Sequence, residues 1–335
     1  MAAKYQATDY LYGSARVRAL ETKLIGRERT ERMLEARNAG EILASLEEHG
    51  FELIRNERGE LLREETLMSA LVGAFAELDA IAGARAVIEF LRYPTDCNNI
   101  KAQIKCFSRG VEARSMMIEG VGTLHVNEIE SAFREKDYSR FPANMAKAIP
   151  ACEEDFAKTK NPQVVDLMLD RACYADMLSS ARENGVPYAV RLVEAKIDLQ
   201  NIVTCLRLLR MSLGASGTSM LDAAYLEGGT LSRALLIEAL SEGESWLGER
   251  LLYTRYSSLL SNDEVLSLGQ IEKRADEIFS ELVSEAKYIP FGAEVLIGYA
   301  LAVENEVKNI RIILAAKDAG WPPESIRERL RKSYV

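Results

Sequence analysis

An internal repeat constrains the fold of this 335-residue chain more than any other feature. Three segments share the pattern acid-x-x-Asn-Ile, with the acid and the amide at Asp96 and Asn99, Asp198 and Asn201, and Glu306 and Asn309. The three asparagines are 102 and 108 residues apart. Self-similarity at a fixed period indicates tandem structural modules. We therefore expect three homologous modules, covering residues 1–125, 126–231 and 232–335.

A second landmark repeats at nearly the same period. Residues 118–124 read IEGVGTL and residues 226–231 read LEGGTL, so that Gly122 and Gly229 are 107 residues apart. The third copy lacks this landmark because the chain ends first, and terminal repeats are often atypical. In Gly-Thr-Leu we expect the glycine to end one helix and the threonine to cap the next.

The spacing of apolar residues predicts helices almost throughout. Leu199, Ile202, Leu206 and Leu209 recur every three or four residues, which places them on one helix face. The same spacing occurs in two further sets, Val303, Val307, Ile310 and Leu314, and Ile81, Ala84, Ile88 and Leu91. Alternation of period two is best around residues 52–58, which is too short for a sheet. Prolines 142, 150 and 162 are expected beside loops, and Pro94 should start or kink a helix. We predict an all-α fold.

The acid and the asparagine of each repeat share one helix face, because residues three apart are neighbours there. Asparagine is unfavourable inside a helix, and a buried amide requires a hydrogen-bond partner. We therefore expect the asparagine to bond across to a neighbouring element and fix its register. A ligand site is the alternative, but a chain seldom keeps three evenly spaced copies of one catalytic site.

Motifs for catalysis, metals or cofactors are nearly absent. The two histidines, His49 and His125, lie in neither a zinc-protease nor a di-iron pattern. No phosphate-binding Gly-Lys-Ser/Thr occurs. The glycine-rich segment 214–219 could contact phosphate, but it lacks lysine and is expected to be a flexible loop. The five cysteines form no CxxC and are expected in the core. We expect no catalytic residue, no cofactor and no metal.

Charge and hydropathy limit the classes of partner that this chain could bind. The net charge of −9 disfavours nucleic acid, which needs a basic face. Residues 1–40 and 306–335 each carry +3, so the body between them carries −15. An acidic body could attract a basic partner, although a solvated surface is the simpler interpretation. No uncharged run approaches the roughly 20 residues of a spanning helix, and no signal peptide opens the chain. These features favour a scaffold or adaptor over an enzyme.

The chain resembles the C subunit of the prokaryotic V-type (A-type) ATPase, the counterpart of the eukaryotic d subunit. Four segments carry the resemblance, which extends over essentially the whole chain: residues 10–19 (YLYGSARVRA), 93–101 (YPTDCNNIK), 197–202 (IDLQNI) and 309–317 (NIRIILAAK). The threefold acid-x-x-Asn-Ile at this period is the most specific shared feature. No family motif marks the interface residues.

The resemblance implies three similar helical domains around a pseudo-threefold axis, which form a funnel. It implies a non-catalytic socket that joins the central-stalk D and F subunits to the membrane ring of proteolipid subunits and transmits torque for ATP-linked proton or sodium transport. One copy per complex, a monomer in isolation, would lie in the cytoplasm against the inner face of the membrane. The alternative is an all-helical repeat adaptor of another assembly. An all-α enzyme with an undetected site is less favoured.

Overall fold

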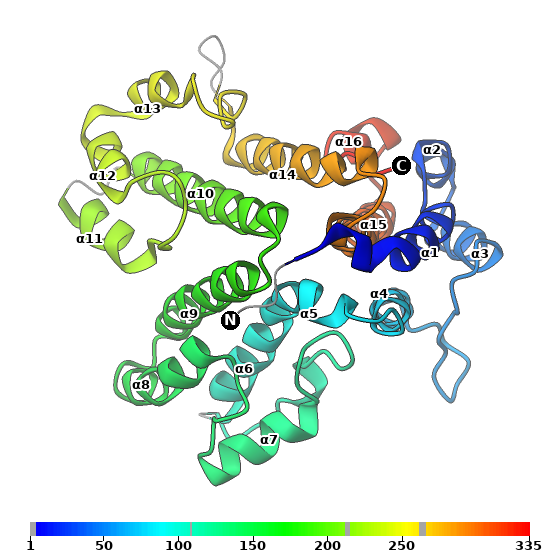
Figure 1. The fold of residues 1–335 in the computed structure, drawn as a ribbon, viewed down its shortest axis with the longest axis horizontal. Helices are drawn as coiled ribbons and strands as arrows, with labels where there is room; N and C mark the ends of the chain where they lie inside the picture. Colours follow the sequence, from blue (N-terminus) through cyan, green and yellow to red (C-terminus); the bar gives the residue numbers. More distant parts are fainter. Residues whose placement is uncertain (1–4, 108, 212–214, 261–265) are drawn as a thin grey trace. The chain divides into compact units, whose positions relative to one another are not determined.

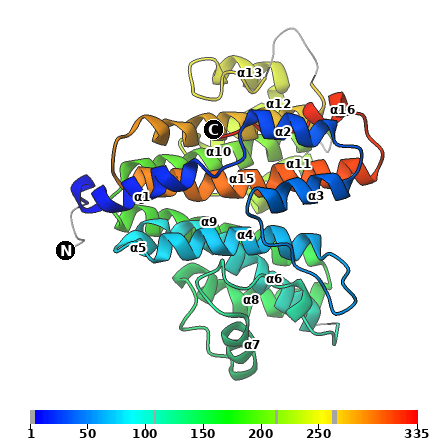
Figure 2. The same ribbon diagram turned by 90° about the vertical axis from the view of Figure 1, so that its right-hand side faces the viewer.

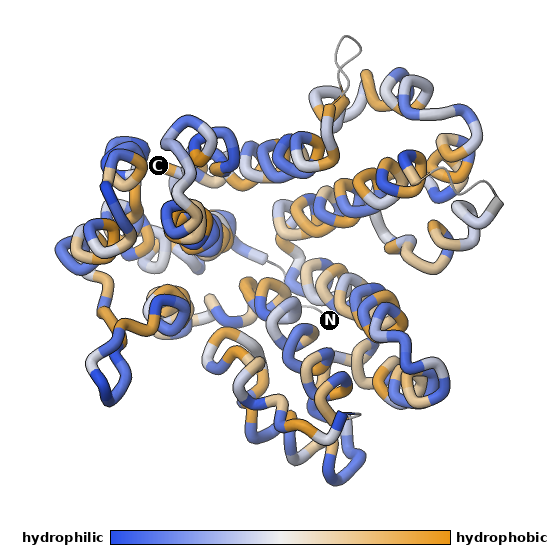
Figure 3. Tube along the Cα trace, turned by 180° about the vertical axis from the view of Figure 1, so that it is seen from behind, coloured by the Kyte–Doolittle hydropathy of each residue, from blue (hydrophilic) through white to orange (hydrophobic). Residues whose placement is uncertain are grey.

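A computed structural model describes residues 5–107, 109–211, 215–260 and 266–335 of the chain. Every regular element among the described residues is a helix. The only β-structure in these residues is one isolated antiparallel bridge between Arg55 and Leu61. The all-α prediction is therefore confirmed. The bridge lies in the loop between α3 (Ala39–Glu48) and α4 (Arg63–Asp79), and the tip of this loop is hydrophilic (Figure 3).

Two compact units divide the chain: an internal unit built from Glu89–Ile278, and a terminal unit that joins Gln6–Ile88 to Phe279–Val335. The internal unit contains η2 (Glu89–Leu91), α6 (Tyr93–Phe107), η3 (Arg114–Met116), α7 (Val126–Glu135), α8 (Ala143–Thr159), α9 (Pro162–Glu183), α10 (Pro187–Arg210), α11 (Ala215–Ala224), α12 (Arg233–Glu242), α13 (Glu244–Leu251) and the first part of α14 (Leu268–Ser284) (Figure 1). The predicted module boundaries at 125/126 and 231/232 lie inside this unit, and the three modules stay a prediction.

The terminal unit contains the remaining elements. They are η1 (Ala7–Tyr10), α1 (Leu11–Glu21), α2 (Arg27–Glu35), α3 (Ala39–Glu48), α4 (Arg63–Asp79), α5 (Ala84–Ile88), the end of α14, η4 (Glu285–Tyr288), α15 (Ala293–Asp318) and α16 (Pro323–Arg327). Helix α15 is the centre of this unit, and α1, α3, α4, α5 and α16 all contact it. Figure 2 shows α4 and α15 side by side.

Burial all round α15 explains its central place. Every residue from Ala293 to Val303 except Glu294 is buried, so this stretch has no solvent-facing stripe. A Cβ on Gly298 would meet the Cβ of Ala286, so glycine lets η4 pack directly on the helix. In the internal unit the corresponding centre is α9, which contacts α6, α8 and α10.

Local signals set several helix ends. Asn161 and Pro162 begin α9, where the Asn161 side chain accepts a hydrogen bond from the Gln163 N–H, and Pro187 begins α10. Pro94 is the second residue of α6, as expected for a helix start. Pro150, expected beside a loop, instead lies inside α8.

Two further local predictions are wrong. One set of apolar residues at helical spacing is buried but does not share one helix: Ile81, Ala84, Ile88 and Leu91. A turn that contains Gly83 at φ 75° separates α4 from α5, and the chain then continues into η2. Left-handed backbone of this kind favours glycine and interrupts the helix. The glycine-rich segment is not the expected loop, because its residues 215–219 form the start of α11; Gly214 lies outside the described residues.

Candidate functional site

The six residues of the repeat motif lie on three long helices. Asp96 and Asn99 are on α6, Asp198 and Asn201 on α10, and Glu306 and Asn309 on α15. Five of them are buried, and Glu306 retains some exposure. Polar groups in such positions need hydrogen-bond partners, and those partners recur from copy to copy.

Each asparagine forms two hydrogen bonds with the backbone of one residue, one through its amide nitrogen and one through its amide oxygen. The Asn99 Nδ2 donates to the Ile118 carbonyl and its Oδ1 accepts from the Ile118 N–H, both at 2.8 Å. Asn201 pairs in the same way with Leu226, at 2.8 and 2.9 Å. Asn309 pairs likewise with Arg331, at 3.0 and 2.9 Å. Each amide therefore fixes a later segment of chain against its helix.

The aspartates of the first two copies bind the Gly-Thr-Leu landmark. Asp96 accepts from the Thr123 hydroxyl at 2.6 Å, from the Thr123 N–H at 2.9 Å and from the Leu124 N–H at 3.3 Å. Asp198 accepts from the corresponding groups of Thr230, at 2.5 and 2.9 Å, and of Leu231, at 3.0 Å. The Tyr256 hydroxyl also donates to Asp198, at 2.7 Å.

The threonines therefore do not cap the next helices, contrary to the prediction. The residues that precede α7 and α12 are His125 and Ser232, two positions after each threonine. Both threonine hydroxyls instead donate to a buried aspartate. A buried carboxylate attracts this donor strongly, because hydrogen bonds to an ionised group are stronger than neutral ones.

The glycines of the landmark make room for this contact. A Cβ on Gly122 or Gly229 would collide with the carboxylate of Asp96 or Asp198. Gly120 and Gly228 have φ values of 84° and 99°, a conformation that favours glycine. The two sequence landmarks are thus two sides of one contact, which we call an anchor. The common period of the two landmarks is the sequence signal that links them.

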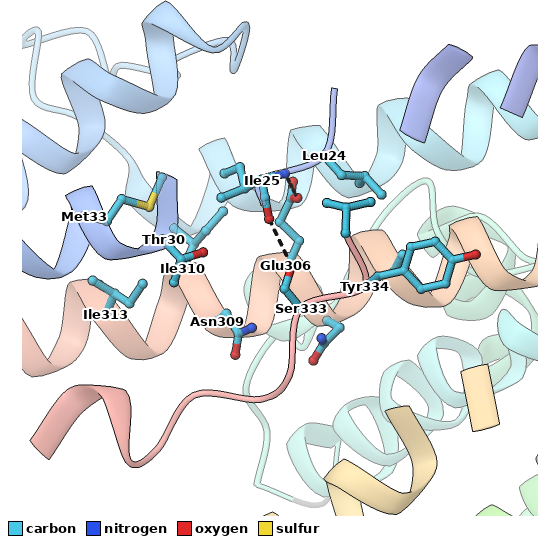
Figure 4. Close-up of a pocket in the computed structure, with 13 residues that line it drawn as sticks. Leu24, Ile25, Thr30, Met33, Glu306, Asn309, Ile310, Ile313, Ser333 and Tyr334 are labelled. Atoms are coloured by element: carbon cyan, nitrogen blue, oxygen red, sulfur yellow. Dashed lines mark hydrogen bonds between the residues drawn. The ribbon is translucent and has the colours of Figure 1, made fainter. Parts of the chain in front are cut away.

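The third anchor is completed by the other end of the chain. Glu306 accepts a hydrogen bond from the Ile25 N–H, and the Ser333 hydroxyl donates to the Ile25 carbonyl at 3.2 Å (Figure 4). The third repeat lacks the Gly-Thr-Leu landmark, as the sequence shows. Its place is taken by residues near the start of the chain, and the longer glutamate side chain spans the gap to them. The anchor consequently holds the segments around Ile25 and Ser333 on α15.

Burial raises the pKa of two of the repeat acids. The pKa of Asp96 rises to about 6 because the carboxylate is desolvated, although its hydrogen bonds from Thr123 and Leu124 oppose the shift. The pKa of Glu306 rises to about 7 for the same reason, opposed by the Ile25 N–H and by Arg29. Burial also raises the pKa of the Tyr256 hydroxyl, and its hydrogen bond to Asp198 adds to the rise.

Both units contain a surface cavity. In the terminal unit a cavity of about 360 Å³ is lined by α1, by the segment after α3, and by α4 and α15, with Glu306 in its wall. In the internal unit a groove of about 530 Å³ runs between α9, α10 and α11, with Leu167, Met211 and Met220 among its apolar lining residues. Partly apolar concavities of this size can hold a ligand or a segment of a partner.

The cysteines and histidines do not gather into a common site among the described residues. All five cysteines are buried free thiols, as expected for core residues. His125 pairs with Glu119 at 2.6 Å, and His49 contacts Arg29. Across the described residues, no group of His, Cys, Asp or Glu side chains could hold a metal ion. In the same residues no helix is both long enough and apolar enough to cross a bilayer.

The family model and the similar proteins all point to a C subunit of an A-type or V-type ATPase or ATP synthase. The sequence model of the ATP synthase (C/AC39) subunit family matches residues 14–329. The C subunit of the A-type ATP synthase from Thermococcus onnurineus is 26% identical, covering 97% of this chain and 90% of its own. The corresponding A-type ATP synthase C subunit of Haloferax volcanii is 28% identical, with 95% and 96% covered. The C subunit of the V-type sodium ATPase from Enterococcus hirae is 24% identical over 71% of this chain and 72% of its own.

Proposed function

Because the chain belongs to the ATP synthase (C/AC39) subunit family, we propose that it is the non-catalytic connector of a rotary A/V-type ATPase. In this role it joins the central stalk of the soluble ATPase head to the membrane ring of proteolipid subunits. It transmits torque between ATP turnover and the transport of protons or sodium ions. It performs no bond-breaking step itself.

The family match over residues 14–329 is the observation that carries this proposal. The three anchors support it, because their asparagine amides bond to the chain's own backbone and hold later segments against the long helices. A torque-bearing connector needs segments that cannot slide along their helices. A paired amide contact meets that need, since any slip breaks two hydrogen bonds of a buried asparagine at once.

Its proposed partners are the central-stalk D and F subunits on one side and the proteolipid ring on the other. We place one copy in each complex, peripheral to the membrane on its cytoplasmic face, with the three modules arranged around a pseudo-threefold axis as a funnel. The −15 body would attract a basic stalk end and accelerate its docking. Docking rates should then fall as salt screens the attraction.

Reconstitution tests the proposed role directly. The rotary complex would be assembled with and without this chain, and both ATP hydrolysis and ATP-driven ion uptake into vesicles would be measured. We expect the complex without the chain to retain ATP hydrolysis by the head but to lose ion uptake, with uptake restored when the purified chain is added. Equal ion uptake with and without the chain would overturn the connector role.

A further inference from the structure

The third anchor differs from the other two in how well its carboxylate is satisfied. Asp96 and Asp198 each accept from a threonine hydroxyl and from two backbone N–H groups. Glu306 accepts only from the Ile25 N–H, through Oε2. Within the residues that the structure describes, its Oε1 atom has no hydrogen-bond partner. Glu306 retains some exposure, so this unbonded oxygen can be reached by a donor from another molecule.

That carboxylate borders the cavity of about 360 Å³ in the terminal unit. The deeper walls contain the buried side chains of Leu24, Ala74, Tyr299 and Val303. One side is the small-residue face of α4, and a Cβ placed on Gly73 there would meet no atom within 4 Å. The cavity is therefore open along α4, next to the Glu306 carboxylate, whose second oxygen has no hydrogen-bond partner among the described residues.

The lining of the cavity contains more carboxylates than ammonium groups. Two of its lining carboxylates, Glu306 and Glu52, form no ion pair among the described residues, and Lys23 is the one lining ammonium in the same condition. Arg29 does not line the cavity, but it lies close enough to Glu306 to oppose the rise in the pKa of that carboxylate. The third carboxylate, Glu77, is paired with Arg16 at 2.5 Å. The His49 ring adds little positive charge, because burial and the neighbouring Arg29 lower its pKa.

We propose that this cavity receives a lysine or arginine side chain of the central stalk, whose cationic head pairs with the free carboxylate oxygen of Glu306. The proposal rests on the connector function, which supplies the partner polypeptide. An ammonium or guanidinium group provides the missing donors, and its aliphatic stem fits the apolar walls. The open face of α4 allows the partner's backbone to approach closely.

Binding of the stalk to Glu306→Gln tests the proposal. The affinity of the purified full-length chain for the D–F pair of the same source would be measured at low and moderate salt. Glu304→Gln is the matched control, since it makes the same charge change two residues away on α15 and Glu304 does not line the cavity. We expect Glu306→Gln to weaken binding at least about tenfold relative to Glu304→Gln. Equal affinities would overturn the cationic pocket and leave the connector role intact, whereas no binding by the unaltered chain would overturn both.

A second measurement does not depend on any variant. Carboxyl-carbon NMR of the ¹³C-Glu-labelled chain would follow the titration of Glu306, with Glu306→Gln used to assign its signal. The charged or titratable groups around Glu306 are Lys23, Arg29, His49, Glu52, Glu77, Tyr299 and Tyr334. We expect a pKa near 7 in the free chain and a fall of more than one pH unit in the D–F complex. An ordinary pKa in the free chain would show that an internal cation already occupies the site, which contradicts the proposal.

Discussion

Removing the amide of the second anchor should destabilise the internal unit strongly. Asn201 is 1% exposed and Leu226 is 4% exposed, so water cannot replace the two hydrogen bonds between them. In Asn201→Ala the Leu226 N–H and carbonyl are both left unpaired. Each unpaired buried group costs about 1–3 kcal/mol. The expected loss in the free energy of unfolding is therefore about 2–6 kcal/mol.

The measurement is urea unfolding followed by the fluorescence of Trp246, in a Trp321→Phe background. The chain has two tryptophans, and Trp246 is the one in the internal unit, so its signal reports on that unit alone. Hydrogen exchange at the Leu226 amide gives a local readout, since this N–H donates to Asn201. Its protection should fall by at least about tenfold.

Gln200→Ala is the control for this experiment. Gln200 is the preceding residue on α10 and is exposed, and its side chain makes no hydrogen bond among the described residues. Its removal should change stability by less than about 0.5 kcal/mol. Asn201→Asp keeps the size of the side chain but replaces the donor with an acceptor, so it should destabilise as well. If Asn201→Ala proved no more destabilising than Gln200→Ala, the anchor would not hold the loop as argued.

Three further changes extend the test. Gly229→Ala should cost about 1–3 kcal/mol, because its Cβ displaces the Asp198 carboxylate, whereas Gly269→Ala, in an open helical position, should be neutral or stabilising in the same urea assay. Tyr256→Phe should cost about 1–3 kcal/mol, because it removes a hydroxyl that donates to a buried carboxylate; a loss under about 0.5 kcal/mol would assign Asp198 no such bond. The pKa of Glu306 is raised by folding, so its protonated form stabilises the folded state below about pH 4.5, and this contribution of up to about 3 kcal/mol is lost as the pH rises through about 7. The difference in unfolding free energy between the unaltered chain and Glu306→Gln should follow that curve, and a flat difference from about pH 4 to 8 would contradict it.

The sequence was sufficient to predict the fold class and the repeated polar positions. Periodic apolar residues such as Leu199 and Ile202 lie on α10, where both are buried. Local spacing failed where glycine interrupted it, because the turn at Gly83 divides a set of residues that would otherwise share a face. Pro150 lies inside α8, so a proline alone did not mark a helix end.

The anchors show what local sequence reasoning omits. Threonine is a common N-cap, and this preference pointed to a local role for Thr123 and Thr230. A carboxylate 27 or 32 residues earlier in the chain binds them instead. The partner of Glu306 was further away still, since Ile25 is 281 residues distant. No pattern near Glu306 indicates that the start of the chain completes its anchor.

Native mass spectrometry of the purified chain mixed with the D and F stalk proteins tests the connector role most directly. The account predicts a 1:1:1 complex at low salt that dissociates as the salt concentration rises, because the attraction between an acidic body and a basic stalk end is screened. A chain that is folded and helical by circular dichroism, yet forms no complex with D and F at low salt, would contradict the account.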